Sequence, residues 1–135
     1  MTYTLRSTCL TTCETIDGGE AIRLHFVDQA DRDVALELPF AQAEAVVMTL
    51  PLLLSMAVRG QTGSPESRYV FPLGRWSIES GKDNRLILTL ETDDGFQVSF
   101  GVPFNACQAI GWSLEHEGKR ASELADEERS PVTVN

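Results

Sequence analysis

Two stretches of the chain, residues 21–27 and 85–91, alternate apolar and polar side chains. Every second residue is apolar: Ile22, Leu24 and Phe26 in the first stretch, and Leu86, Leu88 and Leu90 in the second. This period of two is typical of a strand with one face in a core. Turn-forming residues and a second alternating run follow each stretch, so we expect two β-hairpins.

A shift of 64 residues places one hairpin on the other without a gap. The shift aligns Leu38-Pro39-Phe40 with Val102-Pro103-Phe104, and then Ala45, Val46 and Leu50 with Ala109, Ile110 and Leu114. Both copies change from period two to helical spacing at the same place, which indicates an internal duplication. We predict that residues 22–50 and 86–114 adopt the same structure.

Each hairpin is expected to follow one more strand and to precede a helix. Residues 73–79 alternate, and residues 7–15 are rich in threonine, which suits strands. The proline of each Pro-Phe step cannot donate to a sheet ladder, so the strand ends there and a helix follows. Asn105 is the expected N-cap of the second helix, with Gln108 three residues on.

The predicted fold class is therefore α+β, with two tandem pseudo-symmetric β-β-β-α repeats, antiparallel meanders each with a helix packed across it. The length of 135 residues suits a single domain. Its expected parts are repeat 1 at about 1–58, a linker at 59–68, repeat 2 at about 69–118 and an acidic C-terminal tail at 119–135. Within the tail, residues 119–129 suit one more exposed helix, and residues 130–135 are expected to fray.

The first helix differs from the second because it is apolar almost all round. Between residues 41 and 57 its apolar side chains are Ala45, Val46, Val47, Met48, Leu50, Leu52, Leu53, Leu54 and Met56. Such a helix must be covered on every side. Either it is the central helix of the monomer or part of it meets another chain, with Leu53 and Met56 as interface candidates. Pro51 is expected to kink the helix or to start a second segment.

Charge and cysteine usage narrow the partners and the location. The formal net charge of -9 disfavours nucleic acid and anionic membranes and favours a basic protein partner. The N-terminus has neither the basic start nor the apolar run of a secretory signal. Polar residues and a proline interrupt the apolar run 45–58, so we expect no transmembrane helix. Three cysteines, an odd number, favour free thiols and a cytoplasmic protein.

Cys9 and Cys13 are the first candidates for a metal or disulfide site. On an extended strand their backbones would lie roughly 13 Å apart on the same face, too far for either. A turn in this segment, or a cysteine from a neighbouring strand, would reopen the question. We expect three ordinary thiols.

The remaining polar residues carry no recognisable catalytic motif. His25 is expected in a surface salt-bridge cluster with Arg23 and Glu37, and His116 is expected to be solvated near the end of the second helix. The aspartates at 28, 31 and 33 resemble the start of a calcium loop, but the required glycine and the downstream glutamate are missing. We therefore predict no catalytic residue, no cofactor and no metal.

Curved antiparallel strands followed by a helix, repeated in tandem, resemble the element order of the Whirly-type and Pur-alpha-type single-strand binders. Such binders need a basic groove and exposed aromatic residues on the sheet. The outward strand positions here are Arg23, His25, Glu37, Ile87, Thr89, Glu91, Gln97, Ser99 and Gly101. Because this set is neither basic nor aromatic, we expect no nucleic-acid partner.

Two functions fit these expectations. The first is a non-catalytic protein-interaction or adaptor domain, which can be a homodimer and which holds a partner on sheet or helix surface. The alternative is a small-ligand binding protein or enzyme with a pocket between the two repeats. A flat apolar patch would favour the first, and a deep pocket with converging polar groups the second.

Overall fold

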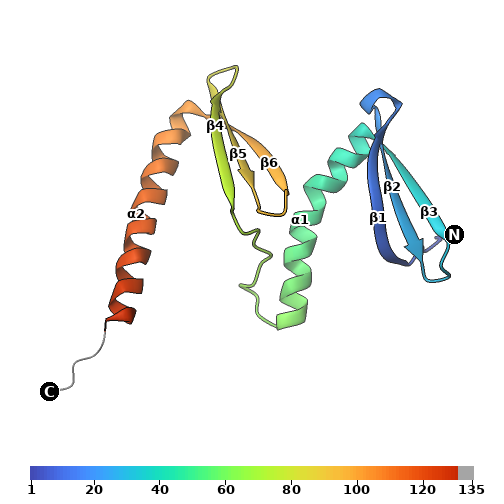
Figure 1. The fold of residues 1–135 in the computed structure, drawn as a ribbon, viewed down its shortest axis with the longest axis horizontal. Helices are drawn as coiled ribbons and strands as arrows, with labels where there is room; N and C mark the ends of the chain where they lie inside the picture. The colour runs from blue at the N-terminus through green and yellow to red at the C-terminus, as the bar shows by residue number, and fades with distance from the viewer. Residues whose placement is uncertain (131–135) are drawn as a thin grey trace. The chain divides into compact units, whose positions relative to one another are not determined.

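The computed structural model describes residues 1–130. The chain divides into two compact units, the first ending at Val70 and the second beginning at Phe71. Each unit is a three-stranded antiparallel sheet followed by a helix (Figure 1). The first contains β1 (Ser7–Ile16), β2 (Ala21–Asp28), β3 (Asp33–Pro39) and α1 (Phe40–Thr62), and the second contains β4 (Arg75–Ser80), β5 (Arg85–Glu91), β6 (Gln97–Pro103) and α2 (Phe104–Arg129). The predicted α+β fold of two β-β-β-α repeats is confirmed.

The hairpins of the two units share one register. Strand β2 pairs with β3 from Ala21↔Pro39 to Val27↔Asp33, and β5 pairs with β6 from Arg85↔Pro103 to Glu91↔Gln97. Each pair recurs 64 residues later, and so do the turn bonds: the N–H of Asp28 donates to the carbonyl of Arg32 at 3.0 Å, and that of Thr92 to Phe96 at 2.9 Å. The hairpins therefore follow the shift read from the sequence.

The first strand of each sheet departs from this symmetry. The pairing of β1 with β2 shifts at two places, whereas β4 pairs with β5 without a shift. Cys9 pairs with Val27, and Cys13 pairs with Leu24. Since these partners lie three residues apart on β2, the two cysteines face opposite sides of the sheet. The expectation that Cys9 and Cys13 share a face was wrong.

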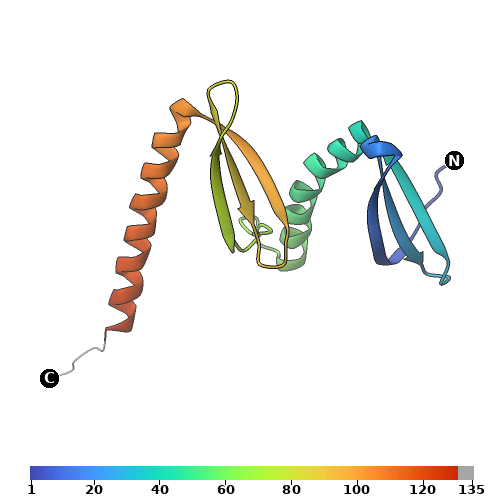
Figure 2. The ribbon, with the colours of Figure 1, turned by 45° about the horizontal axis from the view of Figure 1, so that its top comes forward.

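Each helix begins on the residue that follows its sheet, with no loop residue between them (Figure 2). Strand β3 ends at Pro39, and the N–H of Phe40, the first residue of α1, donates to the carbonyl of Glu20 at 2.8 Å. In the second unit the N–H of Phe104 donates to the carbonyl of Asn84 at 3.1 Å. These bonds hold the start of each helix beside the turn that precedes the middle strand.

This junction corrects three expectations about the helices. Asn105 lies inside the first turn of α2 and is not the N-cap, because the helix has already begun. Helix α2 runs unbroken to Arg129, so residues 119–129 form no separate helix. Helix α1 continues through Pro51 and four residues into the expected linker, to end at a left-handed Gly63. Its axis changes direction along its length in both ribbon views, as an interior proline explains.

Within each unit the helix touches its sheet near the junction and leaves the rest of the sheet face uncovered. Helix α1 contacts β2 and β3, and α2 contacts β6. Ala43, in the first turn of α1, is the one apolar residue among those described that is buried, with 6% of its surface exposed. The expected packing of each helix across its sheet is therefore limited, inside a unit, to the first turns.

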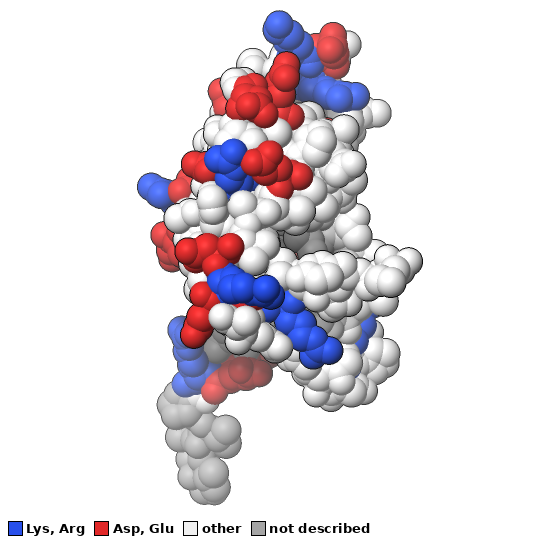
Figure 3. Space-filling view, turned by 90° about the vertical axis from the view of Figure 1, so that its right-hand side faces the viewer, with Lys and Arg blue, Asp and Glu red and all other residues white. Residues whose placement is uncertain are grey.

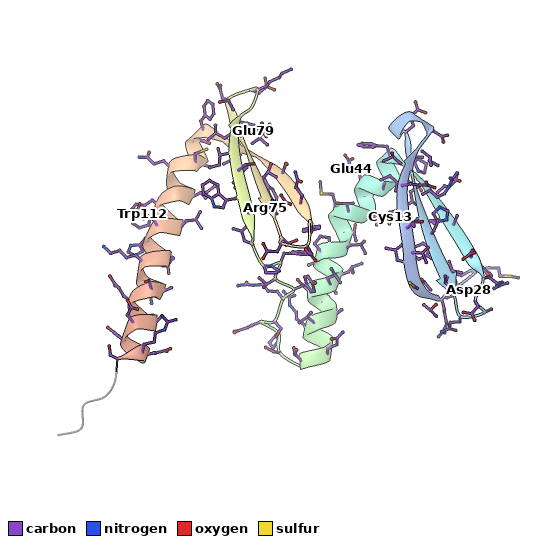
Figure 4. All side chains as sticks on the ribbon, viewed as in Figure 1. Cys13, Asp28, Glu44, Arg75, Glu79 and Trp112 are labelled. Carbon is purple, nitrogen blue, oxygen red and sulfur yellow. The ribbon has the colours of Figure 1, made fainter. Side chains whose placement is uncertain are left out.

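The β2–β3 turn is held by the carboxylate of Asp28, which is only 3% exposed (Figure 4). Its Oδ1 accepts the backbone N–H groups of Ala30 at 2.9 Å and Arg32 at 3.0 Å. Its Oδ2 lies 2.8 Å from a guanidinium nitrogen of Arg32. The backbone hydrogen bond from Arg32 is the main cause that lowers the pKa of Asp28, and the guanidinium contributes in the same direction. The turn thus requires an ionised carboxylate.

We predict that Asp28→Asn lowers the free energy of unfolding at neutral pH, because an amide nitrogen would face the Arg32 guanidinium. A carboxyl whose pKa is lower in the folded state stabilises above its unfolded pKa, and the effect is lost as the pH falls through the folded pKa. Wild-type stability should therefore fall below about pH 4, and the Asp28→Asn variant should show a shallower fall. Urea unfolding followed by circular dichroism across pH 3–7 measures both.

The matched control is Asp31→Asn, which removes a carboxylate from the same turn. Asparagine tolerates the positive φ of 57° at that position. Equal pH profiles for the two variants would contradict a specific role for Asp28.

Candidate interaction surface

Each sheet has one apolar face, which strand alternation builds from all three strands. The first apolar sheet face consists of Leu10, Cys13, Thr15, Ile22, Leu24, Phe26, Val34, Leu36 and Leu38. The second consists of Trp76, Ile78, Ser80, Leu86, Leu88, Leu90, Val98, Phe100 and Val102. Trp76 is 66% exposed, and Leu10, Leu36, Ile78 and Phe100 are also exposed. Both faces have the composition of a core and lie open to water.

Helix α1 carries two apolar stripes, as the helical advance of about 100° per residue shows. The first stripe is Ala43, Val46, Val47, Leu50, Leu53, Leu54, Ala57 and Val58, and it starts at the buried Ala43 beside its own sheet. The second stripe is Ala45, Met48, Leu52 and Met56. Met48 is 78% exposed, Leu52 60% and Met56 54%. Polar residues separate the two stripes: Gln42 and Thr49 along one side, and Glu44 and Ser55 along the other.

Helix α2 keeps the first stripe near its start and has lost most of the second. In the 64-residue register, Cys107, Ile110 and Leu114 stand where α1 has Ala43, Val46 and Leu50. The counterparts of Met48, Leu52 and Met56 are Trp112, His116 and Arg120. Trp112, labelled in Figure 4, stacks on His116, and the ring centroids are 4.9 Å apart. The second stripe is therefore continuous and apolar on α1 alone.

The two interface candidates lie on different stripes. Leu53 belongs to the first stripe, and Met56 to the second. Met48 and Leu52 were missed as site residues, although their spacing to Met56 was present in the sequence. They were not recognised because a helix that is apolar on nearly every side shows no distinct stripe. The two stripes become distinct only when the polar residues between them are placed around the helix axis.

The exposed area of the chain is large for its mass. The accessible surface is 11,636 Å². Two separate compact units of half the mass each would expose about 8,500 Å² together, so the excess is about 3,000 Å². Figure 3 shows charged side chains gathered toward one side of the face drawn, and beside them a broad area with none. Large apolar side chains contribute to this excess, among them Met48, Leu52 and Trp76, all more than half exposed; a folded protein normally buries such side chains.

Helix α1 is long and apolar enough, by length and composition, to cross a bilayer. Chain contacts along its side argue against that placement. The N–H of Tyr69 donates to the hydroxyl of Ser55 at 3.1 Å, and the guanidinium of Arg59 donates to the carbonyl of Ser67 at 2.8 Å. Ser55 lies about 10 Å inside the helix end, and irregular backbone is not tolerated against lipid at such a depth.

The opposite face of the first sheet carries a charged cluster. The guanidinium of Arg23 lies 3.1 Å from Glu14 and 2.8 Å from Glu37, and the ring of His25 lies 3.1 Å from Glu14. The hydrogen bond to His25, followed by that to Arg23, lowers the pKa of Glu14. The cluster is half-exposed, as expected for a surface network. Glu37 pairs with Arg23, and Glu14 takes the place beside His25 that was expected for Glu37.

The opposite face of the second sheet is polar as well. Thr89 and Ser99 share a hydrogen bond of 2.8 Å, and Arg75 lies 2.7 Å from Glu91. The strand positions expected to face outward therefore do so in both sheets. They form neither a basic groove nor a row of aromatic rings, which a single-strand binder would need.

The depressions on the surface of residues 1–130 are small. The better-formed depressions have volumes of about 180 Å³, around Tyr3 and Arg32, and about 210 Å³, on α2 beside Trp112. Sites for small molecules usually measure about 300–1,000 Å³. In this part of the chain no group of three His, Cys, Asp or Glu side chains could hold a metal ion. Cys9, Cys13 and Cys107 are free thiols.

No family model matches the chain, and comparisons with curated proteins and with solved structures give no match either. The resemblance to the Whirly-type and Pur-alpha-type proteins thus stays one of element order. What the apolar surface binds must follow from its own chemistry.

Proposed function

We propose that this chain is a non-catalytic protein-interaction module that associates with a second copy of itself through its apolar sheet and helix faces. The observation that carries the proposal is the surface of α1, where Met48, Leu52 and Met56 are all more than half exposed. Side chains of this kind each favour burial by about 1.5–3 kcal/mol. Covering this surface with another polypeptide is therefore favourable.

The amount of exposed surface suits this role. A standard protein–protein interface takes about 800 Å² from each partner, and obligate homodimers take more. The scaling of surface with mass gives an excess of about 3,000 Å² of exposed area. This area is large enough for the interface of an obligate homodimer. Apolar faces without converging polar groups favour association over catalysis.

The alternative of a ligand-binding protein or enzyme gains no support from either unit. The depressions on the described residues are small, and the charged cluster around Arg23 lies on an open sheet face. Its ion pairs satisfy one another, which leaves no poised acid or base aimed at a cavity.

One prediction from this proposal concerns the molecular mass of the protein in solution. Sedimentation equilibrium of the wild-type protein at micromolar concentration should give at least twice the 14.9 kDa of one chain, because burial of the apolar faces drives association. A stable, folded monomer across this range would contradict the proposal.

A second prediction uses the two cysteines that face opposite sides of the first sheet. Cys13 lies on the apolar face, and Cys9 pairs with Val27 on the other side. When the apolar face is covered, Cys13 should react with a thiol reagent at least about tenfold more slowly than Cys9. All three thiols should react at once in 6 M guanidinium chloride.

Cys9→Ser and Cys13→Ser variants assign the two rates. Equal rates in the native protein would show that the apolar face stays open. A protected Cys13 in a monomer would show that the chain covers its own sheet, which would also contradict association.

A third prediction concerns nucleic acid. The charge of -9 and the lack of an aromatic platform should hold the dissociation constant for single-stranded DNA at about 10⁻⁴ M or weaker at physiological salt. Fluorescence anisotropy with a labelled oligonucleotide measures it, and a salt-sensitive micromolar complex would overturn the expectation.

A further inference from the structure

One chain has more apolar helix stripes than apolar sheet faces for them to cover. There are two apolar sheet faces, and each can be covered by one helix stripe in a two-layer arrangement. Three apolar stripes are available: two on α1, and a shorter one near the start of α2 that includes Ile110 and Leu114. Whichever sheet each helix covers, one stripe remains. Because the first stripe of α1 begins at the buried Ala43 beside its sheet, the remaining stripe is the second one on α1.

We infer that the second stripe of α1, formed by Ala45, Met48, Leu52 and Met56, is the surface on which a second copy of this chain docks, stripe against stripe about a two-fold axis. The inference rests on the proposed self-association and assigns its central contact. A second copy is the natural occupant because it brings the same unpaired stripe, and a two-fold interface requires a self-complementary surface.

The side chains of the stripe suit an antiparallel helix pair. Their spacing of three, four and four residues is that of a helix–helix seam. In the antiparallel pair, Ala45 of one copy lies opposite Met56 of the other, so a small side chain meets a long one at each end. Met48 and Leu52 then interlock near the axis.

Charges beside the stripe support the same orientation. Glu44 lies near the start of the stripe and Arg59 beyond its end, on the same side of the helix. Figure 4 shows Glu44 on the first turns of α1. In antiparallel pairing each Glu44 approaches the Arg59 of the other copy, so one ion pair of opposite charges forms near each end of the seam. In a parallel pair each Glu44 would instead lie across from the flank of the other copy that carries Gln42 and Thr49, and no ion pair would form.

The stripe is also free of charge, although the chain as a whole carries -9. A contact centred on Met48 and Leu52 therefore avoids the acidic surface that would repel a second copy. The aliphatic side chains lose their exposed area without desolvating an ion, which is the least costly way to bury a surface.

The decisive experiment measures the dimer dissociation constant of Leu52→Glu and Met48→Glu by sedimentation velocity, with circular dichroism alongside. We expect the dimer dissociation constant to rise at least 100-fold while the helix content is retained. The effect is large because each substitution is present in both copies at the two-fold interface. His116→Glu is the matched control: it adds a glutamate at the repeat-equivalent position of Leu52 on α2, and should leave the dimer intact.

The two original interface candidates separate the stripes. Met56→Glu should give a folded monomer, because the second stripe meets only the other copy. Leu53→Glu should lose structure, because the proposed arrangement places the first stripe over an apolar sheet face, where the charge would be buried unpaired. Should the glutamate variants aggregate, Leu52→Ala provides the same test without a charge, with an expected weakening of at least tenfold.

Several results would overturn the inference. A dimer of wild-type strength in Leu52→Glu and Leu52→Ala would refute the docking surface while leaving the proposed self-association in place. Equal losses in Leu52→Glu and His116→Glu would show a general effect of added charge. A monomeric wild type would refute both proposals, and flotation of the wild type with neutral phosphatidylcholine vesicles would show that lipid covers the stripe.

Discussion

The step from strand into helix without a loop residue is the constraint on which the rest of this structure depends. The N–H of Phe40 is bound to the carbonyl of Glu20, so α1 starts at the end of the sheet and has no slack with which to turn back over it. A helix held in this way contacts its sheet by the first turn and no further. Each unit therefore forms its secondary structure and leaves its apolar faces for another layer to cover.

Internal duplication explains why a sheet with an uncovered apolar face occurs twice in the chain. Sequence divergence explains why the two copies differ. Both units repeat the same junction and the same hairpin register. In α2, however, His116 and Arg120 occupy the positions of Leu52 and Met56. A polar stripe needs no partner, whereas an apolar one does. The asymmetry between the helices is thus the feature on which the proposed role in binding another chain rests.

Much of the fold could be predicted from the sequence because its signals are local. Alternation with a period of two marked the strands, and the 64-residue shift aligned the two hairpins from residue order alone. Both depend on which side chains follow one another, and the pleat of a strand converts that order directly into faces. The outward polar positions, such as Arg23 and Thr89, followed from the same rule. The large number of apolar residues in α1 was also evident from the sequence, but their division into two stripes was not predicted.

Contacts between distant residues decided the rest. Bulges in β1, which arise from its pairing with β2, turned Cys9 and Cys13 to opposite faces and brought Glu14 beside His25. The bond from Phe104 to a turn some twenty residues earlier started α2 before the expected cap. The sequence by itself determined which residues are apolar together on each strand and helix. The tertiary structure decided that these surfaces do not meet inside a unit, because a helix joined directly to its strand cannot reach back across the sheet.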